Sequence, residues 1–290
     1  MPELPEVETI ARGVDKRVRG RRIVSVWTSS KPEPFKSAPE EMVEALKGSV
    51  IQKVHRVGKH IVIDLARTAE AAQWRGQWLV HLGMTGRLLV SHFDVAVPLH
   101  THAIAQLDDQ RELRFVDPRR FGRLQVLDLS QMPQPNKPSG GELAQAKRFT
   151  GSGQEPLTIS RDAFRELFRL RRTPIKSALL NQSLLQGVGN IYADESLFRA
   201  GIRPRRYAAR LTAREMADLW AALQGVLREA IALGGSSVSD YVGADGAKGF
   251  FQLEHKVYMR TGKPCTRCGT PIRRVVVAGR GTHYCPECQR

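Results

Sequence analysis

Four cysteines near the C-terminus constrain the fold of this chain more than any other feature. Cys265 and Cys268 form one Cys-x2-Cys pair, sixteen residues follow, and Cys285 and Cys288 form a second pair. This spacing is typical of a zinc site in which two knuckles supply four thiolates in a tetrahedron. Two disulfides are the alternative, which a reducing cytoplasm disfavours. We therefore predict a zinc ribbon with one structural Zn²⁺ and no open position for catalysis.

The chain is strongly basic. It has 290 residues, with 45 Lys and Arg against 29 Asp and Glu, and a net charge of +16. Residues 156–290 hold 22 of the basic and 11 of the acidic side chains, so the excess is greater in the C-terminal half. Clustered Lys and Arg bind phosphate backbones with release of counterions, which makes nucleic acid the expected partner. A membrane surface is disfavoured, because no basic helix has a clean apolar face.

Length and hydrophobicity limit the class of protein further. A chain of this length with 41% hydrophobic residues can bury a core in each of two domains without disulfides. It has no run of about 18 apolar residues, and its N-terminus lacks the basic and apolar regions of a signal peptide. We therefore expect a soluble cytoplasmic protein.

The N-terminus can carry a nucleophile. The chain begins Met-Pro-Glu-Leu-Pro-Glu, and removal of Met1 would leave Pro2 with a free secondary amine beside the carboxylate of Glu3. A terminal amine has a pKa of roughly 7.7–8.0, against about 10.4 for lysine, so more of it is unprotonated at neutral pH. Most chain termini are frayed and inert. Here an amphipathic helix predicted from Pro5 to Gly20 would hold the amine in place.

Residues 22–129 have the pattern of a β-rich domain. Short apolar or alternating segments are separated by turns rich in Gly and Asp. The expected strands are residues 23–27, 50–54, 61–65, 78–80, 88–90, 103–107, 113–116 and 124–127, with one helix over residues 40–47. Eight short strands favour a β-sandwich or a barrel.

The remaining residues indicate a helical domain after a linker. Residues 131–153 are rich in Pro and Gly, which is typical of an interdomain connection. Helices are expected over residues 162–170, 175–185 and 191–200, followed by a longer helix that begins at a capping box of Thr212 and Glu215 and ends at Gly234. The fold class is therefore α+β with two domains.

Six motifs, in order along the chain, resemble those of bacterial formamidopyrimidine-DNA glycosylase, in the Fpg/Nei family. They are MPELPEVET at residues 1–9, Lys59 before a strand, HLGMTG at 81–86, DPRRFG at 117–122, GVGNIYADE at 187–195 and RGTHYC at 280–285. The resemblance spans essentially the whole chain. It implies an N-terminal β-sandwich with the first helix, then a helix-two-turn-helix bundle and a zinc ribbon.

The resemblance also sets the expected domain boundaries. The β-sandwich catalytic domain would span residues 1–132, and an interdomain linker would span 133–155. The helix-two-turn-helix DNA-binding domain would span 156–235, a lesion-covering loop 236–254 and the zinc ribbon 255–290. Several glycines in the loop are consistent with a mobile cover over a flipped base.

The activity implied by the resemblance is bifunctional base-excision repair of oxidised purines, namely formamidopyrimidines and 8-oxoguanine. The amine of Pro2 would attack C1′ of a flipped nucleotide, and the resulting imine would permit β- and δ-elimination. Glu3 would act as a general acid or base. Lys59 would contact the phosphate beside the lesion. Glu6 and Glu195 are the expected supporting residues.

Residues of both domains are expected to bind the DNA backbone. Asn190, which follows a Gly-Val-Gly turn at a helix N-terminus, and Arg280 in the ribbon would bind the strand together with Lys59. Lys176 matches a family position near the damaged base. His100 completes the expected backbone contacts.

Three further residues are expected to fill the space that a flipped nucleotide leaves. They are Met84, Arg119 and Phe121, which match a family set of methionine, arginine and phenylalanine. Apolar side chains can replace the lost stacking, and an arginine can hydrogen-bond the unpaired base.

Two alternatives remain open. An endonuclease VIII type glycosylase for oxidised pyrimidines would have the same fold, although Leu4 stands where a glycine is expected in that group. A non-enzymatic zinc-ribbon DNA-binding protein would also explain the basic C-terminal half. Under the main hypothesis the protein is a monomer that works at the bacterial nucleoid, on double-stranded DNA containing oxidised bases or abasic sites.

Replacing Cys268 by Ser tests the predicted zinc ribbon. Loss of one thiolate from a four-ligand site should release the zinc and unfold the ribbon, so the affinity for duplex DNA should fall. Metal analysis measures the zinc, and fluorescence anisotropy measures the affinity. Unchanged affinity after zinc loss would refute a role of the ribbon in DNA binding.

Overall fold

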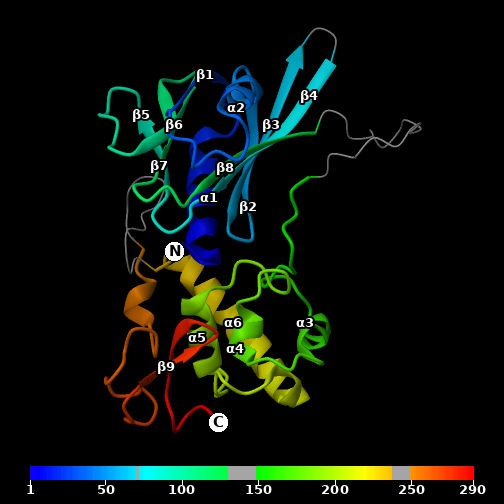
Figure 1. Cartoon of the computed structure of the whole chain (residues 1–290), viewed down its shortest axis with the longest axis vertical. Coiled ribbons are helices and arrows are strands. Elements are labelled where there is room, and N and C mark those ends of the chain that lie inside the picture. The colour runs from blue at the N-terminus through cyan, green and yellow to red at the C-terminus, as the bar shows by residue number, and fades with distance from the viewer. Residues whose placement is uncertain (70–71, 130–147, 237–248) are drawn as a thin grey trace, which may run out of the picture. The chain divides into compact units, whose positions relative to one another are not determined.

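The chain divides into two compact units in the computed structural model, which describes residues 1–69, 72–129, 148–236 and 249–290 (Figure 1). Within the described residues, unit 1 contains 1–2, 6–69, 72–129 and 148–150, and unit 2 contains 3–5, 151–236 and 249–290. The predicted α+β class with two domains is confirmed. Most of the expected linker and lesion-covering loop lies outside the described residues, and the expected domain boundaries stay a prediction.

Unit 1 is built on two antiparallel four-stranded sheets. One has the order β1(Ile23–Thr28), β6(Thr101–Leu107), β7(Arg111–Val116), β5(Arg87–His92). The other has the order β2(Val50–Val57), β3(His60–Ala69), β4(Ala72–His81), β8(Arg123–Asp128). The structure therefore contains the eight predicted strands, arranged as a sandwich.

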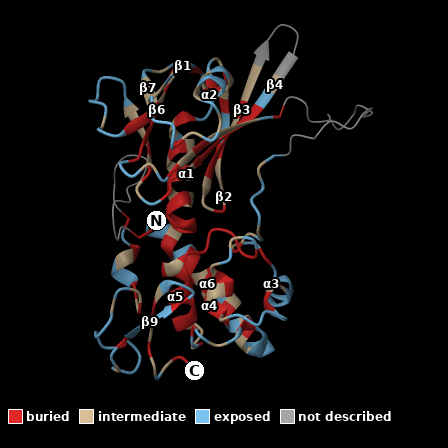
Figure 2. Ribbon diagram, in the orientation of Figure 1, coloured by how far each residue is buried: buried red, intermediate tan, exposed pale blue. Residues whose placement is uncertain are grey.

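Two helices complete the core of unit 1. Helix α1(Leu4–Val18) places one residue every three or four positions in this core, as its apolar spacing predicts, and it is followed by Gly20 with a φ of 82°. Helix α2(Pro39–Leu46) adds Met42 and Leu46. Figure 2 shows the buried residues running along α1. The sheets contribute apolar residues from both layers, including Ile51, Ile63, Trp78, Ala105, Phe115 and Leu124.

Unit 2 is mainly helical. Its elements are α3(Arg161–Phe168), α4(Ile175–Leu179), α5(Asn190–Arg199), η1(Ala208–Arg210), α6(Ala213–Ala232) and η2(Phe251–Glu254). The capping box predicted at the start of α6 is present, with Thr212 accepting from the N–H of Glu215 and Glu215 accepting from the N–H of Thr212. Leu4 belongs to the buried core of this unit.

The helix predicted over residues 175–185 is wrong in length, because α4 ends at Leu179. Immediately afterwards, Asn181 Oδ1 accepts hydrogen bonds from the N–H and the hydroxyl of Ser183, at 3.0 and 2.8 Å. Asparagine competes in this way with the backbone bonds of a helix. The chain therefore leaves α4 in a turn and not as a continuous helix.

The zinc-ribbon segment is a hairpin of β9(Arg273–Val277) and β10(Arg280–Tyr284). Its two-residue turn, Ala278 and Gly279, has φ values of 49° and 72°. Positive φ at both positions is typical of the turn that matches the twist of a hairpin. The ribbon shares a small core with α5, formed by Phe198 of the helix with Val257, Cys265, Ile272 and Cys285. In the part of the chain that the structure describes, no helix is long and apolar enough to cross a membrane.

Candidate functional site

The carboxylate of Glu3 lies at the N-terminus of α5. The N–H of Ile191 donates to Oε1 at 3.1 Å, and that of Tyr192 donates to Oε2 at 3.5 Å. The residue that precedes the helix, Gly189, has no side chain to accept these bonds. A negative group is stabilised at this end of a helix by the free N–H groups and by the helix dipole. Glu3 therefore caps α5 from a distant part of the sequence.

Two glycines make this approach possible. A Cβ on Gly189 would lie 2.2 Å from Glu3 Cδ, and a Cβ on Gly187 would lie 2.9 Å from Leu4 Cβ. The N–H of Leu4 donates to Gly187 O at 3.0 Å. Glu3 and Leu4 are buried, with exposed fractions of 4% and 0%. The residue next to Pro2 is thus fixed, and the predicted helix-anchored N-terminus is not a frayed end.

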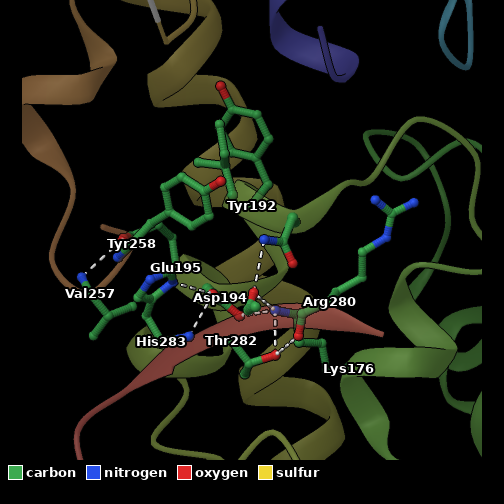
Figure 3. Close-up of polar contacts among 12 residues, drawn as sticks. Lys176, Tyr192, Asp194, Glu195, Val257, Tyr258, Arg280, Thr282 and His283 are labelled. Carbon is green, nitrogen blue, oxygen red and sulfur yellow. Dashed lines mark hydrogen bonds and ion pairs between the residues drawn. The ribbon is translucent and has the colours of Figure 1, made fainter. Parts of the chain in front are cut away.

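Asn190 and Arg280 lie close together within unit 2. Asn190 begins α5, and its Nδ2 donates to the carbonyl of Gly281 at 2.9 Å. Arg280 precedes Gly281 in β10 and is exposed. Figure 3 shows its side chain extending away from the polar network around Lys176. Its guanidinium can therefore meet a ligand beside the N-terminus of α5.

A buried ion pair joins three elements of unit 2 (Figure 3). Lys176 Nζ lies 2.6 Å from Asp194 Oδ1 and donates to Thr282 Oγ1 at 2.8 Å and Gly281 O at 3.1 Å. Both charged side chains have exposed fractions of 0%. Burial lowers the pKa of Lys176, while the Asp194 carboxylate opposes the shift. Asp194 Oδ2 also accepts from the N–H of His283 at 2.8 Å. The network fixes β10 to α4 and α5.

Asp194 is a residue whose role the sequence patterns did not indicate, although it lies inside a recognised motif. It stands four positions after Asn190, and both side chains bond to backbone groups of β10. Residues four apart share one face of a helix. The four-residue spacing of Asn190 and Asp194 is the sequence signal that could have identified Asp194.

Glu195 bonds to a different segment. Its two oxygens accept from the N–H groups of Lys256, Val257 and Tyr258, at distances between 2.8 and 3.1 Å. Burial raises the pKa of Glu195, and these bonds oppose the shift. The side chain therefore orders the backbone at 256–258. Its supporting role at the site stays a prediction.

Tyr258 is a second residue that no sequence pattern indicated. Burial raises the pKa of its phenol, a hydrogen bond with the Asn190 side chain lowers it, and the negative charges of Glu3 and Asp194 raise it again. Its hydroxyl thus shares the site with Asn190 and Glu3. The bonds from the 256–258 backbone to Glu195 hold it there.

The four cysteines fit a zinc ion. Their sulfur atoms all lie within 4.8 Å of one another, with 3.8 Å between Cys265 and Cys288 and 3.5 Å between Cys268 and Cys285. A tetrahedron with zinc–sulfur bonds of about 2.3 Å has edges of about 3.8 Å. The four predicted ligands are therefore brought together with the required spacing.

In unit 1, Asp117 joins two loops that carry predicted DNA-binding residues. Its Oδ1 accepts from the hydroxyl of Thr85 at 2.6 Å and from the N–H of Arg119 at 3.3 Å, and its Oδ2 accepts from the N–H of Gly122 at 2.7 Å. The loops touch, because a Cβ on Gly83 would lie 2.5 Å from a backbone atom of the opposite loop. Asp117 is therefore an organising residue that the sequence patterns did not single out.

The three predicted space-filling residues lie on these loops. Met84 and Phe121 are exposed at 41% and 47%, and the guanidinium of Arg119 lies 4.7 Å from the centre of the Phe121 ring. The carbonyl of His100 accepts from the N–H of Asp117 at 2.9 Å, which places His100 beside the same loops. Exposed apolar side chains on a fixed loop pair suit contact with bases.

Lys59 lies in the two-residue turn between β2 and β3, next to Gly58. Arg56 ties this turn to α1, because its guanidinium bonds to Glu8 Oε2 at 2.8 Å and to Gly58 O at 3.2 Å. Glu6 lies buried in the first turn of α1. Lys59 therefore lies on a turn that the hydrogen bonds of Arg56 stabilise.

His81 links the turn at Lys59 with the loop of Met84. Its Nδ1 accepts from the N–H of Gly83 at 3.2 Å, which requires an unprotonated nitrogen. Burial, together with the positive charges of the nearby His60 and Lys59, lowers the pKa of His81 to about 4. The ring is therefore neutral at pH 7 and can keep this bond.

Comparison with known proteins gives consistent matches along the chain. Residues 1–124 match the family model of the formamidopyrimidine-DNA glycosylase N-terminal domain, 153–242 that of its H2TH domain, and 262–290 that of a zinc finger found in FPG and IleRS. With the sulfur geometry, the last match shows that the four cysteines hold one structural zinc.

Relatives are similar over their full length. The formamidopyrimidine-DNA glycosylase of Solibacter usitatus is 42% identical over 290 residues, which cover all of both chains. A crystal structure of a Lactococcus lactis FPG mutant with Fapy-dG containing DNA has a TM-score of 0.84 and 31% identity. The wild-type enzyme of that organism, with DNA containing an oxidised pyrimidine, has a TM-score of 0.83 and 32% identity. In each comparison the similarity covers all of this chain and all of the chain in the crystal structure.

The neutral His81 predicts a pH dependence of stability. Unfolded His81 takes up a proton near pH 6.5, whereas the folded protein does so only near pH 4. The unfolded state therefore binds more protons between these values, and the free energy of unfolding should fall as the pH falls through this window. His81→Gln should show a weaker fall in urea unfolding experiments. Equal slopes for the two proteins would contradict the neutral assignment.

Proposed function

The chain belongs to the formamidopyrimidine-DNA glycosylase family and is a DNA glycosylase of base-excision repair, and on this premise we propose that it removes oxidised purines through the amine of Pro2. The observation that carries the proposal is the capping of α5 by Glu3, which fixes the residue adjoining Pro2. The amine becomes nucleophilic once Met1 is removed, since an amide nitrogen has no available lone pair.

The proposed chemistry begins with attack on the sugar. The Pro2 nitrogen forms a bond to C1′ of the flipped nucleotide and loses its proton, while the bond from C1′ to the damaged base breaks and the base leaves with the electron pair. Opening of the sugar ring gives an iminium. Loss of a C2′ proton then expels the 3′ phosphate, and a second elimination expels the 5′ phosphate. The enzyme is thus proposed to be a lyase as well as a glycosylase.

Glu3 and Lys59 are proposed to assist this reaction. The Glu3 carboxylate adjoins the nucleophile and can exchange protons with the sugar oxygen or the leaving base. The ammonium of Lys59, on its braced turn, can pair with the phosphate beside the lesion. Glu6, in the first turn of α1, and Glu195 are proposed to support the site without touching the reacting atoms.

DNA is the partner of the enzyme, and two residues of unit 2 are proposed to bind its backbone directly. Asn190 and Arg280 lie together beside the N-terminus of α5, where the side-chain amide of Asn190 and the exposed guanidinium of Arg280 can meet a phosphate. Lys176 is fully buried and ion-paired, so we propose that it acts indirectly, by holding the strand that carries Arg280. His100 is proposed to add a backbone contact from unit 1.

The loops joined by Asp117 are proposed to enter the duplex. Met84 and Phe121 would occupy the stack where the damaged nucleotide was, and Arg119 would bond to the base left unpaired. The presence of Met84, Arg119 and Phe121 together supports action on oxidised purines. Oxidised pyrimidines remain the alternative substrate class, because a Lactococcus lactis relative is known in complex with DNA containing one.

We also propose the domain division expected above, from the sandwich at 1–132 to the ribbon at 255–290, with residues 236–254 covering the lesion. A monomer suffices for this function, because every proposed catalytic and DNA-binding residue is on one chain. We propose that the enzyme works at the bacterial nucleoid in the cytoplasm, because its substrate is DNA.

Borohydride trapping tests the proposed function. The Met1-processed protein, incubated with a duplex containing 8-oxoguanine, should form a covalent complex when borohydride reduces the iminium. Pro2→Gly or retention of Met1 should abolish or cripple trapping, while salt-dependent binding to DNA stays largely intact. Gel electrophoresis separates the trapped complex, and anisotropy measures binding.

The same assay has a decisive negative outcome. Absence of a trapped species on both 8-oxoguanine and abasic duplexes would exclude the imine mechanism. Faster trapping on an oxidised pyrimidine than on 8-oxoguanine would favour the alternative substrate class.

A further inference from the structure

We propose that Gln182 is a positioning residue for the Pro2-Glu3 nucleophile, acting through the turn at residues 187–189. This inference rests on the proposed function, because it assumes that catalysis depends on where Pro2 is held. Gln182 itself does not touch the reacting atoms. Its influence passes through hydrogen bonds that fix the backbone on which the N-terminal segment rests.

The carboxamide of Gln182 bonds to three backbone groups. Its Oε1 accepts from the N–H of Gly187 at 2.9 Å, and its Nε2 donates to Val188 O at 2.8 Å and to Leu180 O at 2.9 Å. Leu180 directly follows α4, so one side chain ties the end of that helix to the turn. The turn needs such support, because Gly187 has a φ of 88° and a glycine is free to leave that conformation.

The turn at residues 187–189 then holds the N-terminal segment in place. Gly187 uses its N–H for Gln182 and its carbonyl for the N–H of Leu4, at 3.0 Å. The Leu4 side chain packs directly on Gly187, and Glu3 packs on Gly189. A shift of the turn would therefore move Leu4 and Glu3, and with them the amine one residue earlier.

A glutamine suits this place because the turn and the end of α4 together present one donor and two acceptors. The oxygen of the amide takes the N–H of Gly187, and the NH₂ group has two hydrogens for the two carbonyls. Methionine has a similar length and lacks both functions. Glutamate keeps the acceptor and loses the donors.

The chain offers a matched control in Gln224 of α6. Its Nε2 also donates to two backbone carbonyls, of Pro156 at 3.0 Å and Ile159 at 3.3 Å. It lies in the same unit, and no bond joins it to the turn or to the N-terminal segment among the contacts of the described residues. Gln224→Met therefore reproduces the loss of an amide without the proposed positioning effect.

Single-turnover kinetics on an 8-oxoguanine duplex tests the inference with Gln182→Met and Gln224→Met, both Met1-processed. Gln182→Met should lower the excision rate by about 10–100-fold, because small displacements of a reacting group have effects of this size. The Kd for a duplex with a tetrahydrofuran abasic analogue should change little. Gln224→Met should lower the Tm by about as much as Gln182→Met does. Its excision rate should nevertheless stay close to that of the wild type.

Three outcomes separate the possibilities. A wild-type rate for Gln182→Met, or a rate loss equal to that of Gln224→Met, would overturn the positioning role. If Gln182→Met is too unstable to assay, Gln182→Glu must give a reduced rate with unchanged Kd, and a wild-type rate would overturn the role. Failure of the proposed function is distinguishable, because the Met1-processed wild-type protein itself would then form no trapped complex on either the 8-oxoguanine or the abasic duplex, whatever the rate of Gln182→Met.

Discussion

The contact between the Glu3 carboxylate and the first N–H groups of α5 is the interaction on which the rest of the proposed site depends. Glycine at position 189 leaves the helix without a capping side chain of its own, and Glu3 supplies the acceptor from almost two hundred residues away in sequence. The contact stabilises α5 through the helix dipole, and it also fixes the segment that follows Pro2. Stability of the helix and the location of the proposed nucleophile, Pro2, are thus consequences of one interaction.

Other polar groups of unit 2 fix the elements that surround this contact. Lys176 and Asp194 are buried without access to water, and such a pair is tolerated only with full hydrogen bonding, which Thr282 and the backbone of β10 provide. The pair joins α4 and α5 to the strand that begins with Arg280. The zinc completes the support of that strand from its other end, because Cys285 directly follows β10. In unit 1, Asp117 has the corresponding role for the loops of Met84 and Phe121.

Local sequence patterns predicted much of the fold and less of the site. Cysteine spacing, period-two alternation and the Thr212 capping box each reflect interactions between near neighbours, and the elements they indicate are present. The length predicted for the helix over 175–185 is wrong, because the side chain of Asn181 bonds to the backbone where the apolar spacing predicts a continuing helix. Asp194, Asp117 and Gln182 were not singled out, because their bonds join residues that only the folded chain brings together. The roles of the recognised motif residues came from resemblance and stay predictions that chemistry must test.

The measurement that tests the central claim most directly is peptide mapping of the borohydride-trapped complex. After nuclease and protease digestion, mass spectrometry locates the residue that carries the sugar remnant. The account predicts the remnant on the nitrogen of Pro2, in a peptide that lacks Met1. A remnant on Lys59 or on any other lysine, with Pro2 unmodified, would contradict it.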